Sequence, residues 1–240
     1  MRILVTRPEN AGRRTASRLQ ALGHDPVLLP LMAADHHPEA VREALHKPRA
    51  ALAITSAEAV RVLQSLGDGL SLHLEDTVFA VGEATAAAAR EAGFRAVQVA
   101  DGTGAGMVEI FGEQLVRLTK AAPLLYLAGT PRSPALEAGL AERNVPILVA
   151  ESYTMRPLPI DPQSLRTALA QPPIDTVLLY SRETARRFFE LPFPQSGSEA
   201  LHGASILCLS ANVAEAIPEH LQQNIRTAAR PDEDSLFALL

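Results

Sequence analysis

The sequence predicts an α/β protein made of two similar lobes with parallel sheets, and three observations lead to this prediction. Short apolar runs typical of buried strands alternate with segments of helical apolar spacing along all 240 residues. The helical segments are long enough to be crossover connections, which favours parallel sheets covered on both faces. The order of the elements also repeats once, which indicates duplication of a whole α/β unit.

Apolar periodicity and chain-breaking residues define the expected elements. The first strand, residues 2–6, precedes a helix over 10–22, with Pro8 just before that helix and Gly23 just after it. Apolar runs without turn residues predict further extended segments at 26–31, 49–54, 77–81, 96–99, 123–128, 146–154, 176–180, 205–209 and 225–228. Helical spacing predicts helices at 38–46, 57–66, 83–92, 106–120, 134–143, 162–170, 182–188, 212–221 with a break near Pro218, and 232–240.

The repeat is visible where strands end and helices begin. Val5-Thr-Arg-Pro8 aligns with Ala128-Gly-Thr-Pro131, an offset of 131 − 8 = 123 residues. Ser56 aligns with Ser181, an offset of 125, and Gly82 aligns with Ser210, an offset of 128. Ligands of open α/β sheets bind at the carboxyl ends of the strands, and clefts between lobes are also favoured sites. We therefore expect binding residues at these strand-to-helix junctions, which are called corners below.

Composition and charge exclude several classes of protein. The formal net charge is −5, which argues against a non-specific nucleic-acid binder. The single cysteine, Cys208, excludes an internal disulfide and a cysteine-based zinc site, and its apolar neighbours predict a buried thiol. The first eight residues are too poor in apolar residues for a signal peptide, and no run approaches a membrane span. We expect a soluble, cytoplasmic monomer without a membrane or nucleic-acid partner.

Known catalytic motifs are missing from the sequence. No phosphate-binding loop or nucleophile elbow occurs, and none of the seven histidines stands in a metal-binding pair, so we expect no metal. The segment Asp101-Gly-Thr-Gly-Ala-Gly106 fails as a dinucleotide fingerprint because its third glycine comes one position early. A flexible loop before a helix is the better interpretation. If the chain is an enzyme, it works by holding its substrate rather than by covalent chemistry.

Two corners carry hydroxyl or glycine residues that could hold an anion. Thr55 and Ser56 stand between a predicted strand and a helix, where free N–H groups and the helix dipole suit a carboxylate or phosphate. Gly82 and Thr85 lie at a similar corner. The structural alternative is that Ser56, like its repeat Ser181, is only a helix N-cap. For Gly82 and Thr85 the alternative is a tight turn.

Tyr153 lies between a predicted strand and the proline-rich segment that follows it. The sequence leaves two interpretations open for this residue. The side chain is either part of the core or a phenol that points into a cleft between the lobes.

Together these segments resemble the uroporphyrinogen-III synthase family of haem biosynthesis. The resemblance covers the whole chain and depends on the order and spacing of short motifs: Val5–Pro8, Ile54–Val60, Ala80–Ala86, Tyr153-Thr154, Ser181 and Cys208–Ala214. It implies two Rossmann-like (flavodoxin-like) lobes with parallel sheets, one formed by residues 1–34 plus 156–240 and the other by 35–155. A two-stranded linker is implied near Val27–Ala33 and Leu148–Met155.

The resemblance also implies an activity, which is the cyclisation of hydroxymethylbilane to uroporphyrinogen III with inversion of ring D and loss of water, without a cofactor. Tyr153 matches the family tyrosine proposed as the acid for hydroxyl loss, and Thr85 and Ser181 match positions lining the cleft. Asn212 and Val213 depart from the threonine pair of many members. The residues expected to bind the eight substrate carboxylates are Arg7, Thr55, Ser56, Gly82, Thr85, Thr130, Ser181, Arg182, Ser210 and Asn212.

The alternative function belongs to a different class, a non-catalytic two-lobed α/β protein that binds a small anionic ligand. The lack of a helix-turn-helix extension after the second lobe weakens a transcriptional role. The missing phosphate loop disfavours a nucleotide-dependent enzyme.

Overall fold

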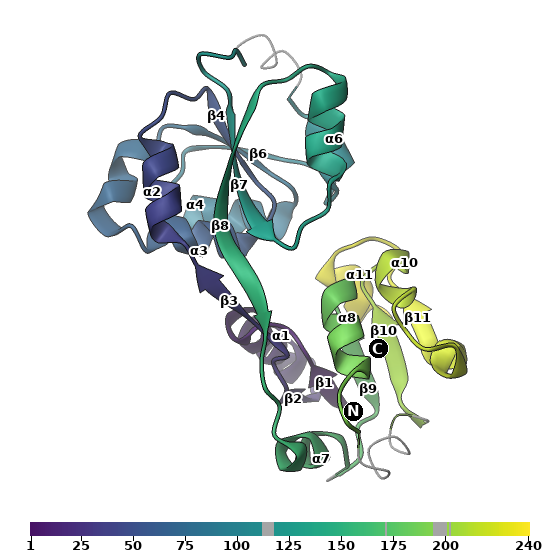
Figure 1. The fold of residues 1–240 in the computed structure, drawn as a ribbon. Helices are drawn as coiled ribbons and strands as arrows, with labels where there is room; N and C mark the ends of the chain where they lie inside the picture. The colour runs from purple at the N-terminus through teal and green to yellow at the C-terminus, as the bar shows by residue number, and fades with distance from the viewer. Residues whose placement is uncertain (112–117, 171, 194–200, 202) are drawn as a thin grey trace. The chain divides into compact units, whose positions relative to one another are not determined.

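The computed structural model describes residues 1–111, 118–170, 172–193, 201 and 203–240. The chain divides into two compact units, whose ribbons are shown in Figure 1. Unit 1 comprises Met1–Ala33 and Arg156–Leu240, and unit 2 comprises Ala34–Met155. The chain passes between the units within two strands that are neighbours in one sheet, β3 (Met32–His36) and β8 (Ile147–Pro157). The predicted α/β class with parallel sheets is confirmed.

Unit 1 contains a five-stranded sheet of order β2-β1-β9-β10-β11, and each pair with a described register is parallel. Its strands are β1 (Arg2–Val5), β2 (Asp25–Leu28), β9 (Thr176–Leu179), β10 (Ser205–Cys208) and β11 (Ile225–Thr227). Its helices are α1 (Glu9–Ala21), α7 (Pro162–Ala170), α8 (Arg182–Phe189), α10 (Ala211–Ala214), the 3-10 helix η3 (Glu219–Asn224) and α11 (Glu233–Phe237).

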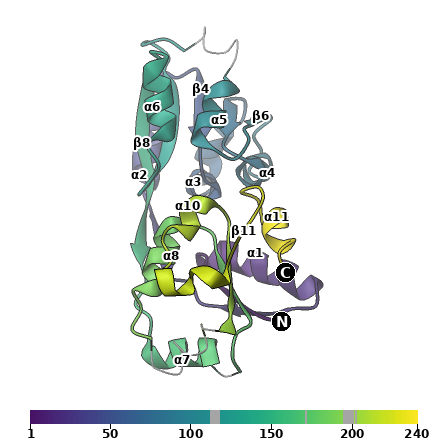
Figure 2. The ribbon, with the colours of Figure 1, turned by 90° about the vertical axis from the view of Figure 1, so that its right-hand side faces the viewer.

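The helices of unit 1 bury apolar side chains against both faces of its sheet. Leu19 of α1 and Leu236 of α11 pack in one cluster with Ile3 and Val5, so these two helices share a face. Figure 2 shows α1 and α11 together, and α8 and α10 on the other side of the sheet. Connections that leave a parallel sheet in opposite directions place their helices on opposite faces, as is seen here.

Unit 2 contains a six-stranded sheet of order β3-β8-β7-β4-β5-β6, in which β8-β7-β4-β5-β6 is parallel. Its other strands are β4 (Ala51–Ile54), β5 (Thr77–Ala80), β6 (Ala96–Val99) and β7 (Leu124–Thr130). Its helices are α2 (Pro38–Leu45), α3 (Ala57–Gln64), the 3-10 helix η1 (Gly67–His73), α4 (Glu83–Glu91), α5 (Gly104–Glu109) and α6 (Ala135–Glu142).

Strand alternation divides the core of unit 2 into two layers. Leu52 and Ile54 of β4 pack in a cluster with residues of α2, α3 and α4. Their neighbours Ala51 and Ala53 point to the other face and pack with residues of α5 and α6. Successive side chains of a strand point to opposite faces, so a strand with four fully apolar residues must be covered on both.

The strand orders of the two units agree with the predicted duplication. The offsets found in the sequence pair β1 with β7, β9 with β4, and β10 with β5. Read in this correspondence, both units have the flavodoxin-like order 2-1-3-4-5, and unit 2 carries β3 in addition. The connections change direction between β1 and β9 in unit 1 and between β7 and β4 in unit 2. Ligands of such sheets bind outside the carboxyl ends of the strands at this switch point.

Three expected elements differ from the structure. The helix expected over 106–120 is wrong in its extent, because α5 ends at Glu109 and Thr119 and Ala122 close a turn; residues 112–117 lie outside the described residues. The helix expected over 212–221 is reduced to the single turn of α10, and η3 begins after Pro218. The extended segment 26–31 is interrupted around Pro30, which has no N–H to donate to a strand ladder.

Among the described residues, no helix is long and apolar enough to cross a membrane.

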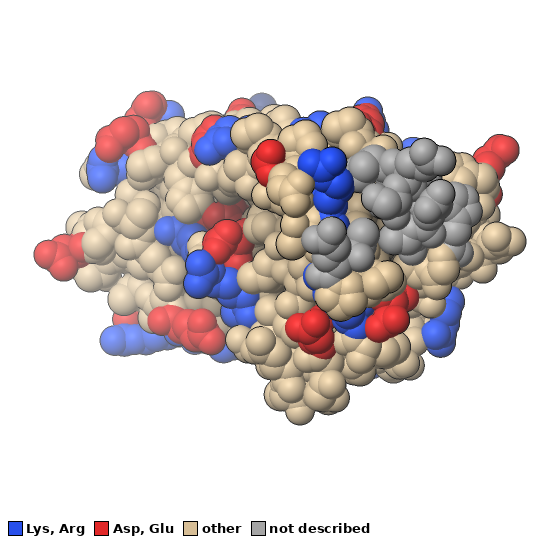
Figure 3. Space-filling view, turned by 90° about the horizontal axis from the view of Figure 1, so that it is seen from below, with Lys and Arg blue, Asp and Glu red and all other residues tan. Residues whose placement is uncertain are grey.

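On the face shown in Figure 3, basic and acidic side chains are interspersed rather than separated by sign.

Candidate functional site

The switch point of unit 2 is hollowed into a cavity of about 310 Å³. The ends of β4, β5 and β7, the loop after β6, the start of α6 and one residue of β8 line it. The lining includes Thr55, Gly102, Tyr126, Gly129, Arg132 and Tyr153. All lining residues belong to unit 2, so this cavity is a property of that unit alone.

Tyr153 lies in β8 beside Gly129 of β7, and the two residues are paired across the strands. Its ring packs against the core of unit 2, as the first interpretation predicts, and it also borders the cavity of this unit. The ring occupies the space that a side chain at position 129 would need, since a Cβ there would lie 2.2 Å from Tyr153 Cζ. Burial raises the pKa of the Tyr153 phenol, and its hydrogen bond with Ser56 only partly opposes this effect. The phenol is therefore protonated at neutral pH.

A second phenol reaches the cavity from the middle of β7. Tyr126 is 1% exposed, and its hydroxyl lies 3.1 Å from Thr55 Oγ1 at hydrogen-bonding distance. Burial raises the pKa of Tyr126, while the hydrogen bond between its hydroxyl and Thr55 acts in the opposite direction. The cavity thus presents two neutral phenols and one threonine hydroxyl.

Arg132 supplies the positive charge among the residues that line the cavity. Its Nε donates a 2.6 Å hydrogen bond to Glu137 Oε1, which keeps the side chain beside the start of α6. Among the described residues, its two terminal nitrogens have no hydrogen-bond partner. A guanidinium with free N–H groups at a cavity can bind a carboxylate.

The other predicted residues of unit 2 take structural positions around this cavity. Ser56 caps α3, because its Oγ accepts a 3.1 Å hydrogen bond from the Glu58 amide. Gly82 caps α4 through its backbone carbonyl, and Thr85 is buried one turn later. Thr130 ends β7 and donates a hydrogen bond to Glu151, which lowers the pKa of that carboxyl. The N-cap interpretation of Ser56 is therefore correct, and it does not prevent the contact with Tyr153.

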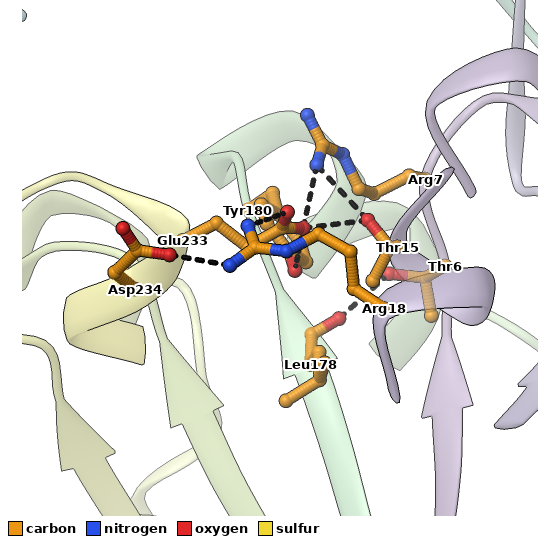
Figure 4. Close-up of polar contacts among 8 residues, drawn as sticks. All are labelled: Thr6, Arg7, Thr15, Arg18, Leu178, Tyr180, Glu233 and Asp234. Atoms are coloured by element: carbon orange, nitrogen blue, oxygen red, sulfur yellow. Dashed lines mark hydrogen bonds and ion pairs between the residues drawn. The ribbon is translucent and has the colours of Figure 1, made fainter. Parts of the chain in front are cut away.

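The equivalent corner of unit 1 carries an ion-pair cluster. Arg7 follows β1, and its Nη1 lies 3.0 Å from Glu233 Oε1. The guanidinium also lies over the Tyr180 ring, with Cζ 4.1 Å from the ring centroid. Figure 4 shows Arg7, Thr15, Arg18 and Tyr180 directed at the Glu233 carboxylate.

The remaining predicted residues lie along the next two strand ends of unit 1. Ser181 caps α8, since its Oγ accepts a 3.1 Å hydrogen bond from the Thr184 amide. Arg182 donates hydrogen bonds to Asn212 Oδ1 at 3.0 Å and to Glu215 Oε2 at 2.9 Å. The predicted binding residues Arg182 and Asn212 are therefore in contact with each other. Ser210 precedes α10, and no hydrogen bond of its side chain caps that helix.

No group of three or more metal-ligating side chains occurs within the described part of the chain. Cys208 is fully buried, and burial raises the pKa of its thiol to about 12. This cysteine is a core residue, as the sequence predicted, and its thiolate is not accessible at neutral pH.

The sequence did not single out Tyr126, Arg132, Tyr180 or Glu233. A tyrosine within the otherwise apolar run 123–128 is a usable signal, because a buried phenol needs a hydrogen-bond partner. Glu233 gave no signal, since its partner Arg7 stands at the opposite end of the chain.

Comparisons with known proteins find a family model and solved structures that are similar to this chain. A family model described as uroporphyrinogen-III synthase HemD matches residues 13–238. The crystal structure of a mutant uroporphyrinogen III synthase from the extremely thermophilic bacterium Thermus thermophilus is similar at 22% identity, with a TM-score of 0.56, over 100% of this chain and 97% of that one. Uroporphyrinogen-III synthetase from Helicobacter pylori is similar at 18% identity, with a TM-score of 0.61, over 88% and 90%. A comparison with curated proteins finds no match.

Proposed function

The chain belongs to the uroporphyrinogen-III synthase family, and from this premise we propose that it binds hydroxymethylbilane at the carboxyl ends of its strands and directs its closure. The observation that carries the assignment is the family match over residues 13–238. Members are cyclising hydro-lyases of tetrapyrrole biosynthesis, which convert hydroxymethylbilane to uroporphyrinogen III. In that reaction ring D is inverted and one molecule of water is lost.

The chemistry requires orientation more than a reactive group. Loss of the hydroxyl gives an azafulvene, which closes spontaneously to the type I isomer if nothing directs it. The enzyme must therefore make the inverted closure faster by confining the chain and orienting its ends. No cofactor is needed for this step, in keeping with the motif-poor sequence.

We assign Tyr153 to the departing hydroxyl. Its phenol is protonated at neutral pH, and it borders the cavity of unit 2. A hydrogen bond from this phenol to the leaving oxygen would stabilise the charge that develops there, and its proton would leave with the oxygen as water. The pyrrole N–H proton released when the azafulvene forms would restore the phenol. Gly129 supports this role because it leaves space for the ring beside the strand.

The substrate has eight carboxylates, and we propose that several strand-end corners hold them. The candidates are Arg7, Thr55, Ser56, Gly82, Thr85, Thr130, Ser181, Arg182, Ser210 and Asn212. Arg132 is added because its terminal nitrogens are free among the described residues, at the cavity lining. Hydrogen bonds between charged groups are shorter and stronger than neutral ones, so two or three such contacts would fix a propionate or acetate arm.

Further parts of the proposal concern the setting of the enzyme. We propose that units 1 and 2 are separate lobes joined by β3 and β8, and that the chain acts as a cytoplasmic monomer without a nucleic-acid partner. The net charge of −5 supports the last point. Sedimentation of the chain with and without substrate would test the monomer.

The decisive experiment is incubation of the purified chain with hydroxymethylbilane, followed by chromatographic separation of the product isomers. We expect the type III isomer in excess over the type I isomer that forms without enzyme. Type I product alone, together with tight binding of the substrate, would favour the alternative of a non-catalytic protein that binds an anionic ligand.

A further inference from the structure

Glu233, the first residue of α11, is the centre of a polar cluster in unit 1. Its Oε1 accepts hydrogen bonds from Arg7 at 3.0 Å, Thr15 at 2.6 Å and Tyr180 at 2.7 Å. Its Oε2 accepts one from Arg18 at 2.7 Å. The donors come from the end of β1, from α1 and from the end of β9, as Figure 4 shows.

The Glu233 side chain is only 18% exposed, and its carboxylate oxygens accept four hydrogen bonds from the described residues. Burial alone would raise the pKa of Glu233, but hydrogen bonds from Thr15 and Tyr180 and the charge of Arg7 outweigh it. Arg18 also pairs with Asp234, so the guanidinium groups of Arg7 and Arg18 face two carboxylates. A buried carboxylate with this many donors holds them in a fixed geometry.

Arg7 is the member of the cluster that can act on a ligand. It lies two residues after the end of β1, and Tyr180 directly follows β9, so both stand at the switch point of the unit 1 sheet. Only its Nη1 has hydrogen-bond partners among the described residues, namely Glu233 and Thr15. The Arg7 side chain is 27% exposed, and the Tyr180 ring lies beneath its guanidinium. Arg7 thus keeps N–H groups for another carboxylate while one nitrogen is fixed.

We propose that Glu233 is a positioning residue, which holds Arg7 over the Tyr180 ring so that the free side of the guanidinium binds a carboxylate of the substrate. This inference rests on the proposed function and deepens it, since it assigns the carboxylate-binding arginine of unit 1 and the residue that orients it. The competing explanation is that Glu233 only stabilises the packing of α11 against α1 and the end of β1. That explanation predicts lost stability without any change in substrate affinity.

The experiment compares Glu233→Gln with Asp234→Asn as a matched control. Asp234 is 80% exposed and pairs with Arg18 from the same turn of α11, but it has no contact with Arg7. We expect Glu233→Gln to raise KM for hydroxymethylbilane by about 3- to 10-fold, the scale of one misplaced charge-assisted hydrogen bond, with kcat nearly unchanged. Asp234→Asn should leave KM unchanged. Thermal melting of both variants would set a common assay temperature below both transitions.

A double-mutant cycle tests whether the effect of Glu233 on KM depends on Arg7. Once Arg7 is replaced by Ala, the further change Glu233→Gln should raise KM no more, because there is no guanidinium left to position. If Glu233→Gln fails to fold, Tyr180→Phe removes one donor and keeps the ring under Arg7. It should then raise KM about 2- to 3-fold, which is a fraction of the effect of the full hydrogen-bond loss.

Each of the following outcomes would overturn the inference. If Glu233→Gln lowered the melting temperature and left KM unchanged, Glu233 would have only the stabilising role. An equal KM increase in the Arg7→Ala background would show that Glu233 acts without Arg7. If Tyr180→Phe has to be used, an unchanged KM for that variant would show that the hydrogen bonds of the cluster do not position Arg7. If the unmutated chain makes no type III product, the proposed function itself fails, and the inference fails with it.

Discussion

Replacing Gly129 by Ala tests whether the position of the Tyr153 phenol controls turnover. Gly129 lies in β7 without a left-handed φ, so the backbone accepts an alanine there. The new Cβ would nevertheless lie 2.2 Å from Cζ and 2.4 Å from the hydroxyl oxygen of Tyr153. The substitution therefore displaces the ring while it leaves the phenol chemically intact.

The size of the effect follows from the distance the ring has to move. Ordinary contact begins at 3.4 Å, so the ring must retreat by at least about 1.2 Å from its present position. A misplacement of about 1 Å at a reacting group can cost on the order of 100-fold in rate. We expect Gly129→Ala to lower kcat for type III product by about 100-fold, with a much smaller change in KM. The assay is initial-rate kinetics with separation of the isomers.

A cycle with Tyr153→Ala separates this explanation from a general disturbance of the cavity. In the Tyr153→Ala background there is no ring to displace, so Gly129→Ala should change kcat little further. Full turnover of the single variant would refute the assignment of Tyr153. So would an equally large loss in the Tyr153→Ala background, because the methyl group would then act on something else.

Three further predictions concern the chemistry, the charge and the pH dependence. Tyr153→Phe should lower turnover by about 10- to 1000-fold and still yield mostly type III isomer in a product analysis, because confinement remains; mainly type I product at full rate would assign the residue to substrate shaping. Arg182→Ala should raise KM more than it lowers kcat in steady-state kinetics, and an unchanged KM would remove it from the binding residues. Burial raises the pKa of Glu58, but Arg61 and His36 outweigh burial and hold it below its usual value. The stability that Glu58 contributes is therefore present above about pH 4.5 and lost as the pH falls through its folded-state pKa. The gap in denaturant midpoint between the unmutated chain and Glu58→Gln should close on acidification, and a constant gap from about pH 7 to about pH 4 would contradict this.

Much of the fold could be predicted because the local patterns and the tertiary structure agree. The four apolar residues of β4 require cover on both faces, and helices on both faces supply it. Ser56 and Ser181 both accept a hydrogen bond from a backbone amide of the following helix, which is what N-cap chemistry predicts. The extent of the helix over 106–120 was wrong because apolar spacing continues where the chain leaves α5.

The candidate site could be predicted only where it depends on strand ends. The motif positions Thr55, Thr130 and Tyr153 all lie at or beside the unit 2 cavity. Glu233 could not be found from sequence, because its role depends on contacts with residues more than 200 positions away. Local patterns carry no information on which side chain will meet a carboxylate across the sheet.

The duplication explains why the two switch points differ in chemistry while they share one topology. The offset of 123 places Ile3 where unit 2 has Tyr126, and Arg7 where unit 2 has Thr130; the offset of 125 places Tyr180 where unit 2 has Thr55. In unit 2 the phenol therefore rises from within β7 and meets a threonine that follows β4. In unit 1 the phenol follows β9 instead, β1 has Ile3 at the position that matches Tyr126, and the Arg7 guanidinium lies over the phenol ring. The unit 2 corner thus places two phenols beside the Arg132 guanidinium around a cavity, and the unit 1 corner places the Arg7 guanidinium over a phenol ring. Under the proposed function, a substrate with a leaving hydroxyl and many carboxylates can use phenol and guanidinium donors alike, which is a physical reason for a duplicated unit to diverge in this way.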